Sequence, residues 1–402
     1  MSLDLSQTAA QLYDAAPRLT ERREAQLQAL ARAVGLLGSV DPDAVEQRRA
    51  EGKATFLVAG LDGKLAGATP VPPLPPDHVV VAVDGSHIDV DRHSPAKLFL
   101  INTGYVSLRY GELPDAALWN TPTLFHDDDA LVLRDTVSTK EVPIEGPVLG
   151  MLRAVMEVEA LADLVEEVPE GLPVLALLDG SLILWGLTGG AFPDFVRDQL
   201  LEERLVPALD RLRKLAESRT LAVASHVSLP RSTDVVNALR VAPEVCRWDK
   251  VNCDGNCGAL VRGTRNCDTV GGVTDADVFA ATLRPGERSP LFRTTSSIVG
   301  DYYGAHQVRF FYANLGEEVA RVEMPEWSAE TPQALDLAHA GLLAQSDKGH
   351  GYPVALQEAH EQAVVSGADR DYFAQLVEEM LTAERLPTGT SQKARSKRTR
   401  FV

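Results

Sequence analysis

Two runs of apolar residues, each followed by Asp-Gly-Ser, constrain the fold of this chain more than any other feature. The first run, Val79–Val83, leads to Asp84, and the second, Val174–Leu178, leads to Asp179. Five consecutive apolar residues before an Asp-Gly pair predict a buried strand that delivers a carboxylate to its C-terminal end, where a glycine lets the backbone turn. Sheets build their sites at such ends, so we expect the two aspartates at neighbouring strand ends. A turn without further function is the alternative for either pair taken alone.

Strand-like and helical patterns alternate after the first aspartate, which indicates an α/β protein. Further strands are expected at 98–106, 131–137, 221–224, 307–313 and 319–324. Helices are expected at 147–168 and 194–216, the second with a kink at Pro207, and three more should begin near Thr331, Val354 and Asp369.

Changes in composition suggest a division of the chain into parts. Proline fills five of the seven positions 70–76, which predicts a stiff, extended linker. Thr20 is a candidate cap for a helix before this linker. The expected parts are an N-terminal helical region at 1–69, the linker at 70–77, a main domain at 78–385 with a cysteine-containing insertion at 245–270, and a basic tail at 386–402.

The charge balance limits the ways in which the chain can meet nucleic acid. The formal net charge of −18 over 402 residues argues against non-specific binding through the whole surface, but it does not exclude a local basic groove. The stretch Lys393–Arg400 carries five positive charges and no negative one, which fits either a phosphate-seeking tail or a solvated terminus. No apolar run reaches the ~20 residues of a membrane span, and no signal sequence is evident, so we expect a cytoplasmic protein without a membrane partner.

A third acidic group is expected from the helix between the two aspartates. Glu157 and Glu159 both stand in its otherwise apolar sequence, and either side chain can face the sheet. Arg153 and Glu157 are also spaced as an ordinary surface ion pair at i and i+4.

A late segment brings a tyrosine and a histidine to the start of a helix. Tyr352 precedes Pro353, which we expect at the first helical position, and His360 follows on that helix. The imidazole has the chemistry to bind a metal or to move protons, although most helical histidines do neither. Carboxylates suit Mg²⁺ or Mn²⁺, and two such ions can promote hydrolysis of a phosphodiester. A histidine ligand fits Mn²⁺ better than Mg²⁺.

Together these motifs resemble those of the NurA nuclease family. The resemblance rests on the two Asp-Gly-Ser motifs, on Arg321–Pro325 and above all on Gly351–His360, and it extends from about Val79 to Phe373. It implies a ribonuclease H-like mixed sheet flanked by helices. It also implies a metal-dependent exo- and endonuclease that acts on DNA, favours Mn²⁺, and works as a homodimer with a HerA-type hexameric ATPase in the resection of double-strand breaks.

The resemblance also implies roles for single residues. Asp84 and Asp179 match metal-binding aspartates of the family, and Tyr352 and His360 match its late tyrosine and histidine. Glu157 fits the helix ligand better than Glu159 does.

Two other functions stay open: a catalytically inactive subunit that regulates the ATPase, and a phosphatase that acts on small phosphoesters. Clustered, mutually repelling carboxylates favour an enzyme over a scaffold.

The cysteines form a second candidate metal site. All four lie within 22 residues, which random placement would not produce: Cys246, Cys253, Cys257 and Cys267. In a reducing compartment this clustering favours four thiolates around zinc or an iron–sulfur cluster. The spacing lacks paired C-x2-C motifs, so unmodified thiols are the alternative.

Overall fold

The computed structural model describes residues 4–90, 96–261 and 263–386, so the predicted basic tail lies outside the described residues except for its first position. Two compact units make up the chain. Unit 1 comprises residues 1–71, 227–296 and 309–322, and unit 2 comprises residues 72–226, 297–308 and 323–402. The structure therefore groups the N-terminal region with two later segments, and the first boundary lies inside the proline-rich stretch.

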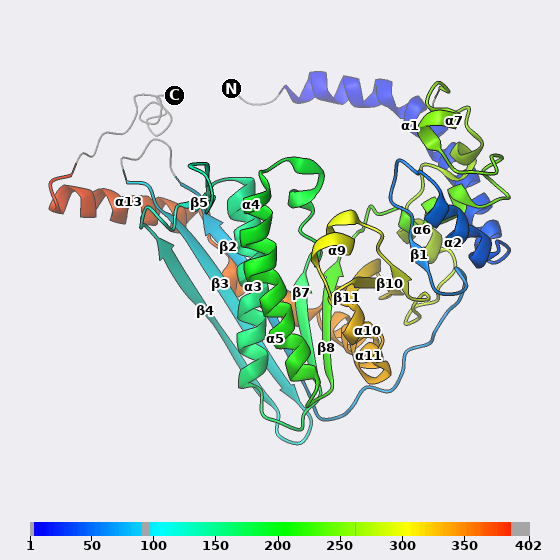
Figure 1. Cartoon of the computed structure of the whole chain (residues 1–402). Coiled ribbons are helices and arrows are strands. Elements are labelled where there is room, and N and C mark those ends of the chain that lie inside the picture. Colours follow the sequence, from blue (N-terminus) through cyan, green and yellow to red (C-terminus); the bar gives the residue numbers. More distant parts are fainter. Residues whose placement is uncertain (1–3, 91–95, 262, 387–402) are drawn as a thin grey trace. The chain divides into compact units, whose positions relative to one another are not determined.

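A mixed sheet forms the centre of unit 2 (Figure 1). Its strands lie in the order β8-β7-β2-β3-β4, where β7 is parallel to β2 and β8, and β3 is antiparallel to β2 and β4. Their bounds are β2 (His78–Ile88), β3 (Phe99–Tyr110), β4 (Asp115–Phe125), β7 (Val174–Asp179) and β8 (Leu221–Val227). The predicted mixed α/β sheet is confirmed.

The strand predictions hold for the buried strands and fail for the exposed ones. No strand was predicted at β4, because its residues from Asp115 to Leu124 are all exposed and lack an apolar stripe. The strand expected at 131–137 is reduced to β5 (Val132–Arg134), which pairs with β6 (Glu141–Pro143) outside the main sheet.

Helices cover one face of this sheet with an apolar surface. The long helix α3 (Pro147–Glu167) agrees with the prediction, and it buries residues such as Leu149, Leu152 and Val155 against the odd-numbered residues of β2. Pro147 at its start has no amide hydrogen, a donor that a first helical turn does not need. Beside it, α4 (Asp194–Arg197), a π-helical stretch (Asp198–Leu205) and α5 (Val206–Ala216) follow one another. The irregularity expected at Pro207 is therefore a π-helix that ends just before it.

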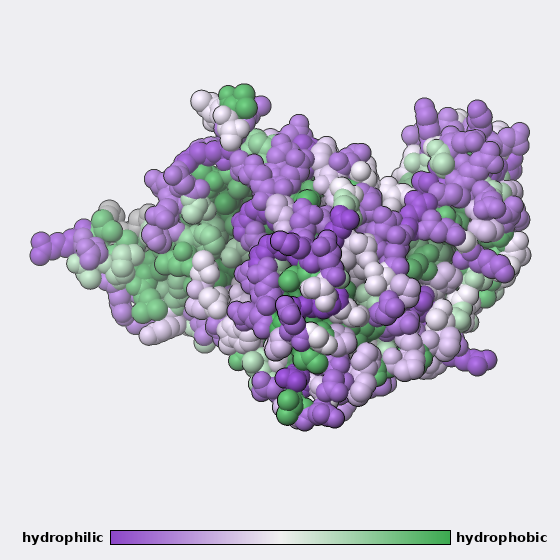
Figure 2. Space-filling model, turned by 60° about the horizontal axis from the view of Figure 1, so that its bottom comes forward, coloured by the Kyte–Doolittle hydropathy of each residue, from purple (hydrophilic) through white to green (hydrophobic). Residues whose placement is uncertain are grey.

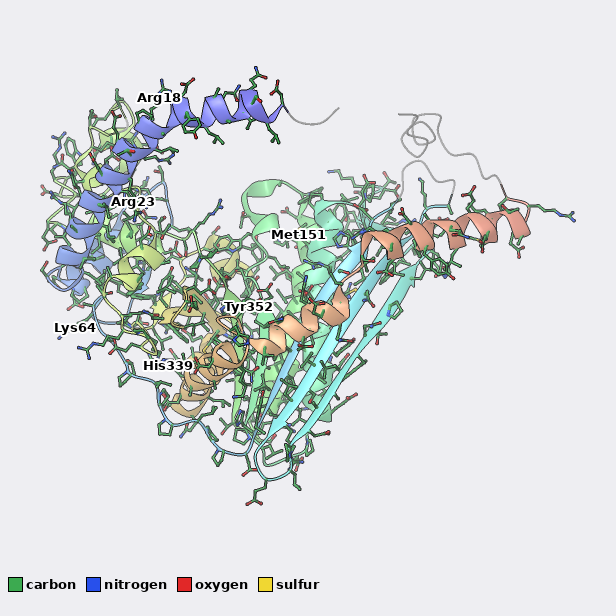
Figure 3. The ribbon with its side chains drawn as sticks, turned by 180° about the vertical axis from the view of Figure 1, so that it is seen from behind. Arg18, Arg23, Lys64, Met151, His339 and Tyr352 are labelled. Atoms are coloured by element: carbon green, nitrogen blue, oxygen red, sulfur yellow. The ribbon has the colours of Figure 1, made fainter. Side chains whose placement is uncertain are left out.

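A second group of helices covers the other face, as the view from behind shows (Figure 3). Gly104 of β3 permits the contact, because a Cβ there would lie 2.4 Å from the carbonyl oxygen of Ala359. Pro353 caps α12 instead of occupying its first turn. The helices after the sheet are α10 (Glu326–Ala329), α11 (Pro332–Lys348), α12 (Val354–Ala363) and α13 (Gly367–Ala383).

Unit 1 consists of short elements and one long helix. Asp4 caps α1 (Leu5–Leu37), and Thr20 lies inside this helix, so the predicted helix start at Thr20 is wrong. Buried apolar side chains such as Phe279, Phe292 and Phe310 form the core. The other elements are α2 (Pro42–Glu51), β1 (Gly60–Leu61), α6 (Asp234–Val241), α7 (Cys253–Cys257), a 3-10 turn (Asn266–Val270), α8 (Asp275–Ala280), β9 (Phe292–Arg293), β10 (Val308–Asn314) and β11 (Val319–Pro325). One residue of β10 and three residues of β11 belong to unit 2.

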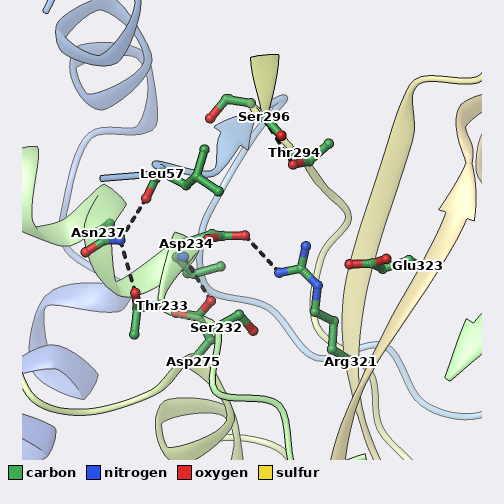
Figure 4. Close-up of polar contacts among 12 residues, drawn as sticks. Leu57, Ser232, Thr233, Asp234, Asn237, Asp275, Thr294, Ser296, Arg321 and Glu323 are labelled. Carbon is green, nitrogen blue, oxygen red and sulfur yellow. Dashed lines mark hydrogen bonds and ion pairs between the residues drawn. The ribbon is translucent and has the colours of Figure 1, made fainter. Parts of the chain in front are cut away.

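A buried polar cluster stabilises unit 1 (Figure 4). Arg321 donates to Asp234 at 2.9 Å, and the Asp275 carboxylate accepts hydrogen bonds from the first amides of α6 and from Tyr312. Burial raises the pKa of Asp275 to about 7, and the neighbouring Asp234 adds to the rise. These contacts give Arg321, Asp234 and Asp275 hydrogen-bond partners, as the burial of charged groups requires. None of the described helices combines the length and apolar composition of a membrane span.

Candidate active site

The site begins where β7 stops and β2 continues. β2 pairs with β7 only from Val79 to Val83, and β7 ends at Asp179. β2 runs on to Ile88 along β3, so Asp84 lies within the strand, at an edge that β7 leaves uncovered. The prediction that Asp84 ends its strand is therefore wrong, because hydrogen bonds to β3 carry the strand past Gly85. For Asp179 the prediction is right: Gly180 follows with a φ of 84°, a left-handed turn that suits glycine.

Gly85 is required for close approach and does not form a turn. A Cβ at this position would lie 2.7 Å from Oε1 of Glu157 and 3.0 Å from Cγ of Arg153. The missing side chain therefore leaves the space into which α3 places both residues. The Nη1 group of Arg153 donates to the Gly85 carbonyl and lies 3.5 Å from Oε1 of Glu157.

Glu157 has the most perturbed carboxyl group of the site. It is 9% exposed, and its Oε1 is buried without a hydrogen-bond partner among the described residues. Burial raises the pKa of Glu157 to about 8; the negative charges of Asp84 and Asp179 add to the rise, and Arg153 opposes it. The Oε1 of this carboxylate, which accepts no hydrogen bond from the described residues, is a position that favours a cation.

Glu159, the alternative helix ligand, faces elsewhere. Its carboxylate accepts two hydrogen bonds from Arg204, at 2.8 and 2.6 Å. This bidentate ion pair lies on the side of α3 that faces the π-helical stretch. The structure therefore brings Glu157, and not Glu159, to the two aspartates.

His360 reaches Asp84 from the opposite face of the sheet. Its Nδ1 lies 2.8 Å from Oδ2 of Asp84, and its side chain is 62% exposed. The end of α12 is fixed on the sheet, because Ser86 and Asn102 both donate to the carbonyl of Ala363, at 2.6 and 2.8 Å. This anchoring holds the histidine one helical turn before the helix end, beside Asp84.

Tyr352 lies at the start of α12 (Figure 3) and reaches Asp179. Its hydroxyl donates to Oδ1 of Asp179 at 2.8 Å. The buried ring of His226 meets the tyrosine ring edge-on, with centroids 5.1 Å apart. All five predicted residues thus come from one unit. Asp84 contacts His360 and Asp179 contacts Tyr352, and both aspartates lie near enough to Glu157 for their charges to raise its pKa.

Glu323 supports the site, and the sequence reasoning gave it no role. Its buried Oε2 accepts from the Ser181 hydroxyl at 2.7 Å and from the Leu182 amide at 3.0 Å. The same hydroxyl accepts from the indole of Trp185 at 3.1 Å. These bonds fix the turn that carries Asp179. The available signal was the motif Arg321–Pro325, which contains Glu323.

The side chains fit divalent ions by their chemistry. Carboxylate oxygens with one imidazole nitrogen form a ligand set for Mg²⁺ or Mn²⁺. The buried Oε1 of Glu157 lies 3.5 Å from Nη1 of Arg153 but accepts no hydrogen bond from the described residues. Asp84, Glu157, Asp179 and His360 would hold such ions. In the described ranges, however, no three or more His, Cys, Asp or Glu side chains are arranged to hold a metal. Metal binding must therefore move these side chains from their present positions; Asp179 can bind an ion through Oδ2 while its Oδ1 keeps the hydrogen bond from Tyr352.

The four cysteines converge in unit 1, around a cavity of about 30 Å³. All are half-buried and none forms a disulfide. Arg240 also lines the cavity, and its guanidinium donates to the sulfur of Cys267 at 3.7 Å. Among the described residues, these cysteines are not arranged to hold a metal either, so zinc or an iron–sulfur cluster stays a prediction.

Comparison with known families gives one match. The model of the NurA domain matches residues 78–365. This range contains the four cysteines and the acidic centre, by which we mean the carboxylates of Asp84, Glu157 and Asp179 with Tyr352 and His360. No curated protein matches the sequence.

Comparison with solved structures gives distant likenesses, which concern the fold alone. A prototype foamy virus protease–reverse transcriptase is 11% identical, covers 40% of this chain and 19% of its own, and has a TM-score of 0.21. An Argonaute of Aquifex aeolicus is 9% identical, with 72% and 29% covered and a TM-score of 0.25. LC9-RNase H1, a type 1 RNase H, is 12% identical, with 43% and 74% covered and a TM-score of 0.21. The chain thus spans less than a third of the first two proteins.

Proposed function

The chain belongs to the NurA family of nucleases, and we propose that it is a divalent-metal-dependent deoxyribonuclease. The observation that carries this proposal is the meeting of three carboxylates, from Asp84, Glu157 and Asp179, where β7 ends beside β2. Mutual repulsion and burial make such a cluster unfavourable without a cation. A protein that only binds a partner has no need of it.

Each residue has a task that follows from its contacts. Asp84, Glu157 and Asp179 would hold the divalent ions through their carboxylates. The Tyr352 hydroxyl orients the Asp179 carboxylate through its 2.8 Å hydrogen bond. His360 is exposed and contacts Asp84, so it can either bind an ion or pass a proton between solvent and the substrate.

Divalent ions held here supply Lewis acidity for hydrolysis of a phosphodiester. Mn²⁺ is the preferred ion in this proposal, because imidazole is a better ligand for Mn²⁺ than for Mg²⁺. Family membership supports DNA as the substrate and a HerA-type hexameric ATPase as the partner in resecting double-strand breaks. The ATPase would deliver strands to the site.

Degradation of linear DNA tests the proposal. Purified parent protein, Asp84→Asn and Glu159→Gln are incubated with end-labelled duplex and single-stranded DNA, with Mn²⁺, Mg²⁺ or chelator. We expect the parent and Glu159→Gln to degrade DNA with Mn²⁺, and Asp84→Asn to lose at least about 100-fold in rate. Equal rates for Asp84→Asn and the parent would refute the assignment. Turnover of a nucleotide monophosphate without any cleavage of DNA would favour a phosphatase.

A homodimer is the proposed assembly, and exposed apolar side chains of unit 2 support it. Figure 2 shows such side chains at the end of the molecule where Figure 1 places β4 and α13. β4 is the outermost strand of its sheet, so its backbone is open to pairing. The exposed apolar residues are Leu118, Trp119 and Leu124 on β4 and Tyr372, Leu376 and Met380 on α13.

Sedimentation analysis tests the dimer. A double change of Trp119 and Leu124 to lysine should convert a dimer to a monomer. Val137→Lys is the control, because Val137 is 93% exposed and lies outside these two elements. A parent protein that sediments as a monomer would contradict the proposed assembly.

A further inference from the structure

Arg153 is a cation placed beside the acidic centre. Its side chain is 32% exposed, whereas the neighbouring Glu157 side chain is 11% exposed, so solvent reaches the arginine more readily than the carboxylate. Its Nη1 donates to the Gly85 carbonyl, and its Nε is buried without a hydrogen-bond partner among the described residues. The guanidinium is thus fixed at one end against β2 and keeps donors for a ligand.

His87 lies on β2, two residues beyond Gly85. Residues 85 and 87 lie on the same face of β2, which is the face that α3 covers, because side chains alternate along a strand. Two residues of strand span about 7 Å. The positive charges of Arg153 and of Arg370, in the first turn of α13, both act on His87 and lower its pKa, although burial contributes most. Arg153 and Arg370 therefore both lie near His87, which follows Asp84 by three residues along β2.

The carboxylate of Asp89, near His87, already has hydrogen-bond partners. Asp89 also acts on His87, with the opposite sign. Its Oδ2 accepts from the Gly146 amide at the start of α3, at 2.9 Å, and its Oδ1 accepts from the Val90 amide at 2.7 Å. The carboxylate thus fixes the loop before α3 and leaves the arginine donors available to another anion.

We propose that Arg153 and His87, with Arg370 at the outer end, bind the phosphate next to the one that is cleaved. This inference rests on the proposed nuclease function and extends it. With the scissile phosphate at Asp84, Glu157 and Asp179, a strand that follows β2 meets Arg153 next and then His87. An arginine fork matches the geometry of phosphate oxygens, and contacts to the backbone set the register of a strand without reading its sequence.

Neutral phosphates test this subsite. A labelled single-stranded oligonucleotide is prepared as a series in which one phosphate at a time is replaced by an uncharged methylphosphonate. Cleavage with Mn²⁺ is measured at each bond for the parent, Arg153→Gln, Arg153→Lys and Arg211→Gln. Arg211 is the control, because it pairs with Asp163 and Glu166 on the surface of α3.

In the parent, we expect a neutral phosphate on one side of the scissile bond to lower kcat/KM about 10-fold or more, since a hydrogen bond to a charged group is lost. Arg153→Gln should cleave the all-phosphate strand about 10-fold more slowly, mainly through KM, and respond less than about 2-fold to the neutral neighbour. Arg153→Lys should be intermediate, and Arg211→Gln should behave as the parent.

Two results would overturn the subsite. One is a parent enzyme that cleaves every member of the series equally fast, a readout that needs no variant. The other is an Arg153→Gln or Arg153→Lys enzyme that stays as sensitive to the neutral neighbour as the parent is. A parent protein that cleaves no DNA at all refutes the nuclease function itself, and this outcome is distinct from the other two.

Discussion

Replacing Glu157 by glutamine should stabilise the metal-free protein, and increasingly so at higher pH. The pKa of Glu157 is about 8 in the folded protein, against 4.5 for an ordinary glutamate. Between these values the folded state holds a proton that the unfolded state releases. The contribution of this group to stability is therefore complete below about pH 4.5 and is lost as the pH rises through about 8.

The size of the effect follows from the difference in pKa. This rise in pKa corresponds to about 5 kcal/mol, and about half of it falls between pH 6.0 and 8.5. Glutamine keeps the shape of the protonated side chain and does not titrate. The free energy of unfolding of Glu157→Gln should thus rise by about 2–3 kcal/mol relative to that of the parent over this range.

Urea unfolding in the presence of chelator, at several pH values from 6.0 to 8.5, measures this difference. Glu159→Gln is the matched control: it removes a partly exposed ion pair with Arg204 on the same helix and should keep the pH dependence of the parent. Added Mn²⁺ should stabilise the parent and not Glu157→Gln. A stability difference between Glu157→Gln and the parent that stays constant with pH would refute the reasoning.

Three further changes test other parts of the account. Gly104→Ala should destabilise the protein by about 1–3 kcal/mol and weaken cleavage, because its Cβ would lie 2.4 Å from a backbone oxygen of α12. Thermal unfolding measures this loss of stability. Gly150→Ala is the control and should be neutral or stabilising, because nothing lies within 4 Å of its Cβ. Tyr352→Phe should lower kcat about 10-fold and raise the Mn²⁺ concentration for half-maximal rate, since Asp179 loses a hydrogen bond; an unchanged Mn²⁺ dependence would count against its orienting role. Metal analysis of protein purified without chelator should find about one structural zinc or an iron–sulfur cluster at the four cysteines, and trace amounts of both would leave only thiols.

The sequence was most informative where the pattern is local and the segment is buried. Helix α3 was expected at 147–168 and occurs at Pro147–Glu167, because its apolar residues recur with helical spacing. The run of five apolar residues before Asp179 predicted the buried strand β7 and the turn after it. The exposed strand β4 has no such pattern, and its pairing with β3 fixes it instead.

Contacts between distant residues decided what the sequence left open. The pairing of β2 with β3 carries β2 past Asp84, and no residue near Asp84 signals this. The choice between Glu157 and Glu159 depends on Arg204, which lies 45 residues after Glu159 and occupies its carboxylate. Glu323 supports the Asp179 turn from 142 residues away, by a hydrogen bond to Ser181.

The position of bound manganese tests the central claim most directly. Crystals of the protein soaked in Mn²⁺ would be measured at a wavelength where manganese scatters anomalously. The account predicts anomalous peaks within about 2.5 Å of carboxylate oxygens of Asp84, Glu157 and Asp179, with the carboxylate of Asp84 turned from His360 toward the ion. Peaks only at other acidic surfaces, with Asp84 still bonded to His360, would contradict it.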